Sequence, residues 1–370
     1  MISIIFGYRD RETARLQRCL ESLSRQSHKD FEVIFIDYGS DHSYQKKAKA
    51  VVTKYDFCRY IYSETQGRPW SRSHSLNIGM KLSEREYVFT CDIDMLFPSN
   101  LMEKLAEKLD QNSFWHVYTN YLEPNFSDWD NIDKYPLKTV NYGGRGILVI
   151  PRKVVFEIQG YDEHYYHWGC EDNDLHHRLK LSGLEYRVEA ENIFLHHQWH
   201  PISYSELPSY IPQDLDGEMY LYYYKNKRLL SRNGGKWGQL ISREDRPILN
   251  YFDIESYSLS IENELVWFDE YPRNYFVQQK LVKLLYRASS GSLLAINGAR
   301  YSNFASSAKR GLNFLNRLMY QKFKLNFGLY ICENPVHRFL LKVIRECPDL
   351  VEDYYLNFPI KRGVSFILRK

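Results

Sequence analysis

Cys91-Asp92-Ile93-Asp94-Met95 is the most informative segment of this sequence. It follows Glu86-Tyr87-Val88-Phe89-Thr90, a run typical of a buried strand, and Pro98 comes soon after it. Side chains alternate along an extended strand, so Asp92 and Asp94 are expected to face the same side, in the crevice beyond the strand's carboxyl end. Their oxygen atoms suit a Mg²⁺ or Mn²⁺ ion that carries a phosphate. An Asp-x-Asp pair alone is weak evidence, because acidic residues are also common at solvated strand ends.

Strand-like and helix-like patterns alternate on both sides of this segment. Apolar runs at residues 2–6 and 31–37 predict strands, and the spacing of apolar residues over 16–23 predicts a helix between them. A second helix is predicted over 72–82, before the strand that leads to Asp92. Such alternation favours a mostly parallel sheet whose ligand crevice lies at the carboxyl ends of the strands. The remaining predicted elements of this half are strands at 146–150 and 193–195 and a helix that begins at Glu171.

Length and composition are those of an ordinary globular enzyme. The chain has 370 residues, of which 44% are hydrophobic, and this length predicts two domains. A net charge of +3 and the lack of any nucleic-acid-binding motif argue against a nucleic-acid partner. The six cysteines show no CxxC spacing, which predicts reduced thiols and a cytoplasmic, bacterial protein. The apolar run at the amino terminus is too short for a signal peptide or a membrane span.

Four blocks of sequence, in this order, resemble the GT-A fold glycosyltransferases, of a family-2-like type with a carboxyl half like that of β1,4-galactosyltransferases and chondroitin polymerases. The resemblance covers roughly residues 1–200 and implies a Rossmann-like α/β domain with a mostly parallel central sheet. The blocks are Ile4–Arg9 with Ile36–Ser40, then Trp70–Gly79, then Asp92–Asp94, and finally Tyr142–Gly144 through Gly160-Tyr161 to Trp168–Asp174. One departure is Tyr38, which stands where the family usually has a second Asp.

The resemblance also implies roles for particular residues. Glycosyl transfer from a nucleotide diphosphate needs a cation to neutralise the leaving diphosphate and a base to accept the proton of the attacking hydroxyl. Asp94 is the expected metal ligand and Asp172 the expected base, with Glu171 binding or orienting the acceptor sugar. The other expected contacts are Tyr8 and Asp37 with the nucleotide base, Arg72 with the diphosphate, and Gly143, Gly144 and Trp168 with the acceptor. Asp92 is expected to contact the ribose, with a contact to the metal through water as a further option.

Most of these residues also have a plainer interpretation. Acidic residues in the first turn of a helix, such as Glu171 and Asp172, are already favoured by the helix dipole. Asp37 could serve as a turn or N-cap residue, Arg72 as a solvated helix charge and Tyr8 as a core residue. Gly143-Gly144 could be a simple turn.

A histidine pair offers a further metal ligand. His196 and His197 end the strand predicted at 193–195, and either ring could face the metal. The resemblance to the family's His-Gln arrangement favours His197. Other histidines nearby, His200 among them, fit no zinc signature and are interpreted as polar loop residues.

The carboxyl-terminal part has a different pattern. Gly234–Gly238 is predicted to be a boundary loop, so the expected domains are a glycosyltransferase domain at 1–240 and a mixed α/β domain at 251–370. Basic residues flank an amphipathic stretch at 312–319. Such a stretch is usually a surface helix; the sharper alternative is a peripheral contact with an anionic membrane or with a partner in polysaccharide assembly. The other predicted elements there are a helix at 277–285 and strands at 292–296 and 363–370.

Three classes of function fit these patterns. The favoured one is an inverting, metal-dependent transferase that uses Mn²⁺ or Mg²⁺ and moves a hexose or N-acetylhexosamine from a UDP-sugar to a saccharide or lipid-linked saccharide acceptor in bacterial surface polysaccharide synthesis. A nucleotidyltransferase is a second class, although no Gly-rich phosphate loop opens the chain. A non-catalytic sugar- or nucleotide-binding module is a third, although both the Asp-x-Asp pair and Asp172 are present.

Overall fold

The computed structural model describes residues 1–138, 145–165, 170–200 and 233–253, together with short segments between residues 258 and 369. The chain divides into two compact units. The first comprises Met1–Gln66, Trp70–Ile202 and Asp216–Ser242. The second comprises Gly67–Pro69, Ser203–Leu215 and Arg243–Lys370.

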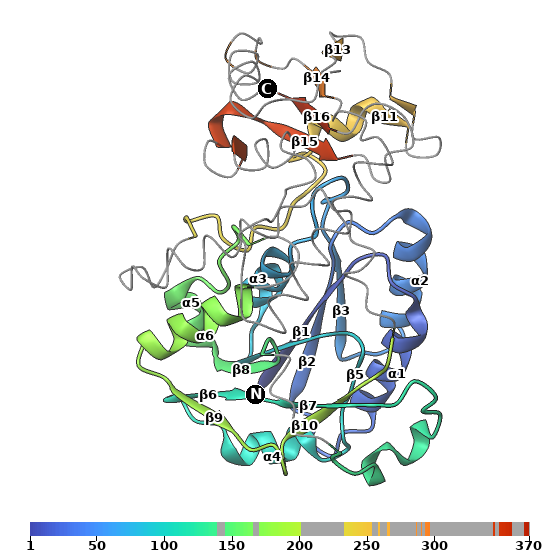
Figure 1. Cartoon of the computed structure of the whole chain (residues 1–370), viewed down its shortest axis with the longest axis vertical. Coiled ribbons are helices and arrows are strands. Elements are labelled where there is room, and N and C mark those ends of the chain that lie inside the picture. The colour runs from blue at the N-terminus through green and yellow to red at the C-terminus, as the bar shows by residue number, and fades with distance from the viewer. Residues whose placement is uncertain are drawn as a thin grey trace, which may run out of the picture. The chain divides into compact units, whose positions relative to one another are not determined.

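A seven-stranded sheet forms the centre of the first unit (Figure 1), with the strand order β3-β2-β1-β4-β8-β6-β9. The pairings of β1 with β2 and β4, of β2 with β3 and of β6 with β9 are parallel, whereas β8 runs antiparallel to both of its neighbours. The predicted mostly parallel sheet is therefore confirmed. The strands are β1 (Ile2–Tyr8), β2 (Phe31–Asp37), β3 (Cys58–Tyr62), β4 (Tyr87–Cys91), β6 (Ser113–His116), β8 (Leu148–Pro151) and β9 (Glu185–Val188).

Helices cover both faces of this sheet. Figure 1 shows α1 and α2 on one side and α3, α5 and α6 on the other. The helix predicted over residues 72–82 is confirmed with the same bounds, and the helix predicted from Glu171 begins at that residue. The helices of the first unit are α1 (Thr13–Ser24), α2 (His42–Val52), α3 (Arg72–Leu82), α4 (Leu101–Lys108), α5 (Arg152–Ile158), α6 (Glu171–Leu181) and the 3₁₀ helix η1 (Trp129–Lys134).

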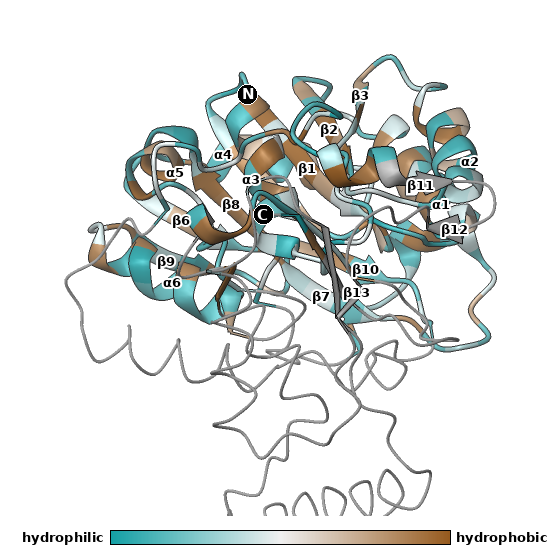
Figure 2. Ribbon diagram, turned by 90° about the horizontal axis from the view of Figure 1, so that it is seen from above, coloured by the Kyte–Doolittle hydropathy of each residue, from teal (hydrophilic) through white to brown (hydrophobic). Residues whose placement is uncertain are grey.

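The alternation of side chains along β1 produces two apolar layers. Ile4 and Phe6 pack with α1 on one face, while Ile5 packs with Leu76 of α3 on the other. Every residue of β1 except Gly7 is buried, as expected for a parallel strand covered on both faces. Figure 2 shows this hydrophobic colouring along the central strands. Each fully buried side chain of this kind contributes about 1.5–3 kcal/mol, so the sheet is a rigid base for the loops at its edge.

A smaller sheet follows the carboxyl ends of β4 and β6. It has the order β5-β10-β7, formed by Met95–Leu96, Phe194–His197 and Tyr118–Tyr121. β10 is antiparallel to β5 and parallel to β7. This pairing joins two parts of the chain that lie about a hundred residues apart, and it confirms the strand predicted near residues 193–195.

The segment predicted as a boundary loop, Gly234–Gly238, packs onto the first unit. The Trp237 ring is 5% exposed and joins the apolar layer beneath α3 and α5. The Lys81 ammonium of α3 lies 4.5 Å from the centre of that ring.

The second unit contains two small sheets among its described residues. β11 (Phe252–Asp253) pairs with β12 (Ser258–Leu259), and a four-stranded sheet has the order β13-β14-β16-β15. Its strands are β13 (Leu265–Val266), β14 (Leu293–Ile296), β15 (Asp353–Leu356) and β16 (Phe366–Arg369), with 3₁₀ helices η3 (Pro247–Tyr251) and η4 (Pro348–Leu350). The strands predicted at 292–296 and at the carboxyl end are confirmed, with shorter bounds.

A buried ion pair fixes the start of this second unit. Arg246 and Asp353 are both fully buried, and the Arg246 Nε atom lies 2.8 Å from Asp353 Oδ1. Arg68 Nη2 reaches the same oxygen at 3.2 Å. The helical patterns predicted at 277–285 and 312–319 lie outside the described residues, so the mixed α/β character of this unit stays a prediction. Among the residues that the structure describes, no helix is long and apolar enough to cross a membrane.

Candidate active site

The turn after β4 brings Asp94 to the end of β10. β4 ends at Cys91, and Asp92–Asp94 form the turn that leads into β5. Met95 of β5 faces His197 in the antiparallel pairing with β10. The Gln198 backbone N–H then donates to the Asp94 carbonyl at 2.9 Å. The acidic turn predicted from the sequence is therefore joined to the histidine-rich end of another strand.

Asp94 lies in a cluster with two histidines. The Asp94 Oδ2 atom is 3.1 Å from His200 Nε2, and Oδ1 is 3.7 Å from His197 Nε2. One potential ligand atom from each of the three residues lies within 4.8 Å of the others. The predicted pair of Asp94 and His197 is thus brought together. His200, which the sequence pattern assigned to a polar loop, completes the group.

The cluster has the properties of a cation site. Asp94 Oδ1 is buried and has no hydrogen-bond partner in the described part of the chain. A buried oxygen of this kind is costly unless a ligand satisfies it. One carboxylate with two imidazoles favours Mn²⁺ over Mg²⁺, because Mg²⁺ prefers oxygen ligands alone.

The charges of the cluster also suit metal binding. Burial by itself would raise the pKa of Asp94, but the hydrogen bond from His200 and the charges of His197 and His200 outweigh burial and lower the pKa. Burial lowers the pKa of His197, and the nearby Asp94 only partly opposes this effect. Near neutral pH, Asp94 is therefore ionised and His197 is neutral, the states that a metal requires of its ligands.

His196, the alternative ligand in the sequence analysis, faces away from this cluster. Its side chain is fully buried, and its Nδ1 atom accepts a hydrogen bond from Asn120 Nδ2 at 3.1 Å. Its ring contacts Tyr135, with the two ring centres 5.7 Å apart. Burial lowers the pKa of His196 to about 4. The alternation of side chains along β10 thus directs His197, and not His196, towards Asp94.

Gln198 holds the cluster against α1, and sequence reasoning missed this residue. It is 1% exposed. Its Nε2 atom donates to the Arg15 carbonyl at 3.0 Å, and its Oε1 atom accepts from Arg18 Nε at 2.6 Å. Its backbone N–H also donates to the Asp94 carbonyl, so this one residue links α1, the acidic turn and the end of β10.

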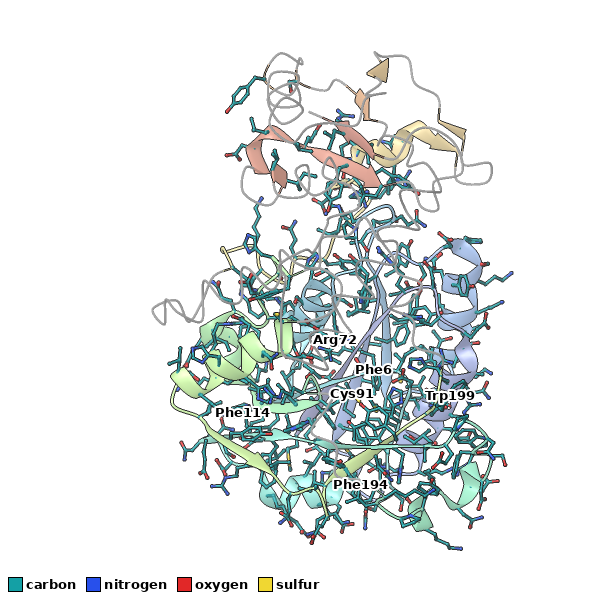
Figure 3. All side chains as sticks on the ribbon, viewed as in Figure 1. Phe6, Arg72, Cys91, Phe114, Phe194 and Trp199 are labelled. Atoms are coloured by element: carbon teal, nitrogen blue, oxygen red, sulfur yellow. The ribbon has the colours of Figure 1, made fainter. Side chains whose placement is uncertain are left out.

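A second group of charges surrounds Arg72, the first residue of α3 (Figure 3). Its Nε atom lies 3.2 Å from Asp92 Oδ1, and its Nη1 atom lies 2.9 Å from Asp172 Oδ1. Burial lowers the pKa of Arg72, but the two carboxylates outweigh burial and raise it well above its usual value. Arg72 is therefore a buried, charged link between Asp92 and Asp172 and not a solvated helix charge. Its expected contact with a diphosphate stays a prediction.

Asp172 lies in the first turn of α6, where the sequence analysis placed the base. Its side chain is 20% exposed, and its Oδ1 atom also accepts a hydrogen bond from Tyr161 Oη at 3.3 Å. Burial raises the pKa of Asp172, while the Arg72 guanidinium opposes the rise. The neighbouring Glu171 is 3% exposed. Asp172 is thus the more open of these two acids.

Gly146 allows the close contact between Arg72 and Asp172. A Cβ atom at this position would lie 2.7 Å from Arg72 Nη2 and from both carboxylate oxygens of Asp172. The Gly146 carbonyl in turn accepts from Arg72 Nη2 at 3.1 Å. Sequence reasoning interpreted Gly146 only as the start of a strand, although its place after a double glycine was a signal of close packing.

The expected base-pocket residues are enclosed. Asp37, at the end of β2, is fully buried; its Oδ1 atom accepts from the Ser40 N–H at 3.0 Å and its Oδ2 atom from Tyr60 Oη at 2.6 Å. Tyr8 is 1% exposed, and its hydroxyl donates to the Arg11 carbonyl. These contacts match the plainer interpretations as a turn residue and a core residue. The base contacts stay predictions. Gly143, Gly144 and Trp168 lie outside the described residues.

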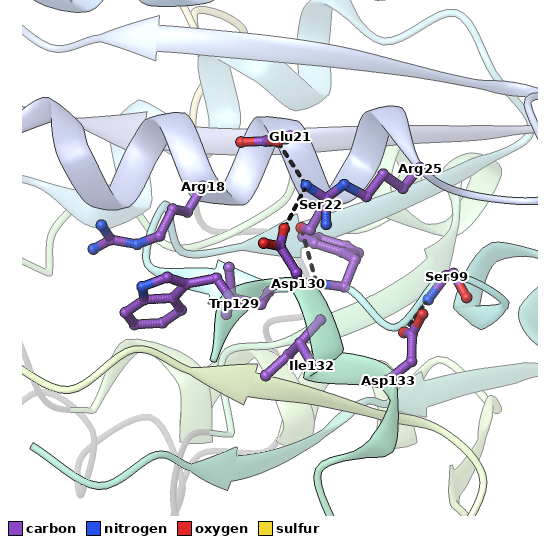
Figure 4. A pocket seen from close by; sticks show the side chains of 11 residues that line it. Arg18, Glu21, Ser22, Arg25, Ser99, Trp129, Asp130, Ile132 and Asp133 are labelled. Carbon is purple, nitrogen blue, oxygen red and sulfur yellow. Dashed lines mark hydrogen bonds and ion pairs between the residues drawn. The ribbon is translucent and has the colours of Figure 1, made fainter. Parts of the chain in front are cut away.

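A separate hollow lies beside α1 (Figure 4), lined by Arg18, Arg25, Trp129, Asp130 and other residues. Its charges pair with one another: Arg25 Nη2 lies 2.6 Å from Glu21 and 3.3 Å from Asp130. The Arg18 guanidinium covers the Trp129 ring at 4.4 Å. These contacts of Arg18 and Arg25 join α1 to η1 beside the hollow.

The stretches of sequence that contain these site residues match two families of known proteins. Residues 3–161 match the model of glycosyl transferase family 2, and residues 131–199 match the model described as the N-terminal domain of galactosyltransferase. The first range holds Asp92, Asp94 and Arg72. The second holds Asp172 and His197.

Among curated proteins, the chain is 28% identical over 157 residues to an uncharacterized glycosyltransferase of Rickettsia bellii, an alignment that covers 41% of this chain and 20% of that protein. It is 26% identical over 135 residues to bovine β-1,4-galactosyltransferase 1, covering 35% of this chain and 30% of that protein. It is 22% identical over 158 residues to human chondroitin sulfate synthase 3, covering 39% and 18%. The matched parts thus span less than a third of these relatives.

Among solved structures, the chain is similar to Staphylococcus aureus TarS 1-349 in complex with UDP-GlcNAc. The identity is 14%, the TM-score is 0.47, and the match covers 62% of this chain and 67% of that one. The matched region, residues 3–199, is therefore that of a family 2 glycosyl transferase with a galactosyltransferase-type segment.

Proposed function

We propose that this chain transfers a hexose or N-acetylhexosamine from a UDP-sugar to a saccharide acceptor, with inversion at the anomeric carbon and with the help of a divalent cation. The observation that carries the proposal is that the Asp92–Asp94 turn takes part in two groups of side chains, one that could hold a cation and one that contains the expected base. Asp94 shares a cluster with His197 and His200, and Asp92, two residues earlier, is tied through Arg72 to Asp172.

The first group supports the donor side of the reaction. Asp94, His197 and His200 would hold the cation, most suitably Mn²⁺. When bound, the cation supplies neutralisation of the charge on the leaving diphosphate. The side chain of Asp92 is 47% exposed beside this group and is available for the ribose. The names of the relatives, galactosyltransferase and chondroitin sulfate synthase, support a hexose or N-acetylhexosamine donor.

The second group supports the acceptor side. Asp172 would accept the proton of the attacking hydroxyl, and burial raises its pKa in the direction that makes it a better base. Arg72 and Tyr161 fix its orientation through the hydrogen bonds to Oδ1. Glu171 would orient the acceptor. Attack by the activated hydroxyl on the face opposite the leaving diphosphate inverts the anomeric configuration.

The proposed setting is bacterial surface polysaccharide synthesis in the cytoplasm, at the inner face of the membrane, with a saccharide or lipid-linked saccharide as acceptor. The basic, amphipathic pattern of the carboxyl-terminal part supports a peripheral contact of this kind. Binding of the full-length chain to anionic vesicles at low salt, and its loss at high salt, is the measurement that bears on this setting.

One experiment tests the reaction and its base together. Full-length protein with Mn²⁺ is given a panel of UDP-sugars and saccharide acceptors, and mass spectrometry detects the products. In Asp172→Asn, kcat is expected to fall by about 10²–10⁴, because the amide keeps the shape but cannot accept a proton. Calorimetry should show UDP affinity close to that of the wild type. Asp56→Asn, the same substitution at an exposed position, is the control and should match the wild type.

Two results would contradict parts of the proposal. Turnover by Asp172→Asn close to the wild-type rate would move the role of base to another residue, with Glu171 the next candidate. A wild type that forms no glycoside and binds UDP equally with and without Mn²⁺ would contradict the function itself. Release of pyrophosphate from a nucleoside triphosphate and a sugar phosphate would instead indicate a nucleotidyltransferase.

A further inference from the structure

Two large aromatic residues are open to solvent, one paired with His197 of the Asp94 cluster in the small sheet and the other next to His200 in the sequence. Tyr121 is 45% exposed and Trp199 is 48% exposed. Trp199 lies between two residues of the site, Gln198 and His200, and Tyr121 lies next to His197. Most of the described aromatic residues of the first unit are packed in its layers, whereas these two rings are available to a ligand.

Tyr121 is held against the cluster by the small sheet. It is the last residue of β7 and faces His197 in the parallel pairing with β10. The centres of the Tyr121 and His197 rings lie 5.0 Å apart. Its ring therefore lies beside one member of the Asp94 cluster.

Trp199 is held through the residues on either side. Gln198 is fixed by its hydrogen bonds to Asp94, Arg15 and Arg18. His200 is fixed by its contact with Asp94 at 3.1 Å. Figure 3 shows Trp199 beyond the end of β10, the strand that begins at Phe194. The exposed indole is therefore carried by backbone that is anchored on both sides.

The shape and polarity of this surface indicate the class of its ligand. An aromatic ring next to a charged cluster suits a molecule with an apolar face and a polar rim, because the ring buries the face while the cluster meets the rim. A pyranose ring has this character. A flat nucleobase would also stack, so the two must be separated by experiment.

We propose that Tyr121 and Trp199 form an aromatic platform that binds the pyranose ring of a substrate beside the Asp94-His197-His200 cluster. The proposal rests on the function proposed above and adds residues that contact the sugar. The pyranose is either the sugar of the donor or that of the acceptor. In the first case the platform controls the affinity for the UDP-sugar, and in the second the affinity for the acceptor sugar.

Calorimetry on the full chain with Mn²⁺ distinguishes the sources. The probes are UDP, UDP-galactose, UDP-GlcNAc and, in the presence of UDP, N-acetylglucosamine. The variants are Tyr121→Ala and Trp199→Ala, each with the matching substitution by Phe. Tyr286→Ala, at a tyrosine that is 67% exposed in the second unit, is the matched control.

The Ala variants should weaken binding of one sugar-bearing probe by about tenfold, the size typical of an aromatic contact, while UDP is bound within about twofold of the wild type. The Phe variants should restore most of the affinity, which a merely structural defect would not predict. Loss of UDP-sugar affinity assigns the platform to the donor sugar, and loss of N-acetylglucosamine affinity assigns it to the acceptor.

Three results would overturn the proposal. One is that every probe binds both Ala variants as it binds the wild type. Another is an equal loss for UDP and the UDP-sugars, which would indicate stacking on the base. The third is a wild type that binds UDP with Mn²⁺ but gains no affinity from either attached sugar and does not bind N-acetylglucosamine. None of these results contradicts the proposed function, because that function is tested independently by Mn²⁺-dependent UDP binding and by the kcat of Asp172→Asn.

Discussion

The carboxyl ends of β2 and β4 lie at the same edge of the sheet, but their aspartates differ. We call the end of β2 closed because both carboxylate oxygens of its aspartate are hydrogen-bonded, and the end of β4 open because one carboxylate oxygen is left for a ligand. At the end of β2, both oxygens of Asp37 accept hydrogen bonds from within the chain, from Ser40 and Tyr60. At the end of β4, Asp94 Oδ1 is buried with no such partner in the described residues, and two imidazoles lie beside it. The carboxylate of an aspartate at a strand end is therefore either saturated by hydrogen bonds or left with an oxygen for a ligand, according to what the rest of the fold supplies around it.

The two carboxyl groups also differ in their acidity. Burial raises the pKa of Asp37, although hydrogen bonds from Ser40 and Tyr60 oppose the rise. The pKa of Asp94 is lowered, because its histidine neighbours outweigh burial. A carboxylate that is kept ionised and is not saturated by hydrogen bonds can still take a cation, whereas one that is saturated mainly stabilises its own turn.

The largest expected effect comes from the same substitution at both strand ends. Asp94→Ala should lower the rate of sugar transfer by at least about 100-fold and remove the dependence of UDP binding on Mn²⁺, because the carboxylate of the cluster is lost. Asp37→Ala should instead lower the free energy of unfolding by about 1–3 kcal/mol, because the Ser40 N–H and the Tyr60 hydroxyl lose their acceptor. Transfer assays, calorimetry and urea unfolding of the two variants make the comparison.

The opposite pattern would break this comparison. If Asp37→Ala kept the wild-type stability but lost UDP affinity, Asp37 would contact the nucleotide, as the family resemblance implies. If Asp94→Ala transferred sugar at the wild-type rate, the open end of β4 would not be the metal site.

An intermediate effect is expected at Gln198, which holds the open site in shape. Gln198→Leu should weaken Mn²⁺ binding by about 10- to 100-fold, the usual cost of losing a residue that orients metal ligands. Paramagnetic resonance of Mn²⁺ measures this affinity without any assay of transfer. The matched control is Gln26→Leu, at a glutamine that is also 1% exposed and donates to the Pro98 carbonyl at 2.7 Å.

Both Leu variants should lose stability, since each removes a buried amide from its partners. Only Gln198→Leu should change the affinity for Mn²⁺. An equal change in both variants would mean that general loosening of the fold, and not the side-chain bonds of Gln198 to Arg15 and Arg18, controls the affinity for Mn²⁺.

The third comparison concerns a buried histidine on the other side of the sheet. His176 of α6 is bonded to the Arg145 carbonyl at 2.9 Å and surrounded by His116, Phe114 and Tyr186. Burial lowers its pKa from 6.5 to about 4. Between these values the unfolded chain binds the proton and the folded chain does not, so stability should fall as the pH drops from about 6.5 to about 4, by up to about 1.4 kcal/mol per pH unit.

Urea unfolding at several pH values measures this slope. His176→Gln should reduce the slope in that window while leaving the slope above pH 7 unchanged. A variant with the full wild-type slope would show that His176 is protonated as readily in the folded chain as in the unfolded one.

Local sequence pattern was sufficient for much of the fold. The apolar runs of β1 and β2 and the spacing within α1 identified these elements, because the periodicity of side chains reflects which faces are buried. The same reasoning placed Asp92 and Asp94 beyond β4, since strand ends in a parallel sheet share one edge. Asp172 was located at the start of α6 through the resemblance, and its role stays a prediction.

The parts that sequence pattern missed depend on contacts between distant segments. His200 and Gln198 gain their positions when β10 pairs with β5, which brings them to Asp94 across about a hundred residues. Gly146 matters only because Arg72 and Asp172 meet over it. Asp37 is enclosed because Tyr60 of the next strand reaches its carboxylate. The identity of a residue sets which bonds it can make, whereas only the folded chain decides which partners are within reach.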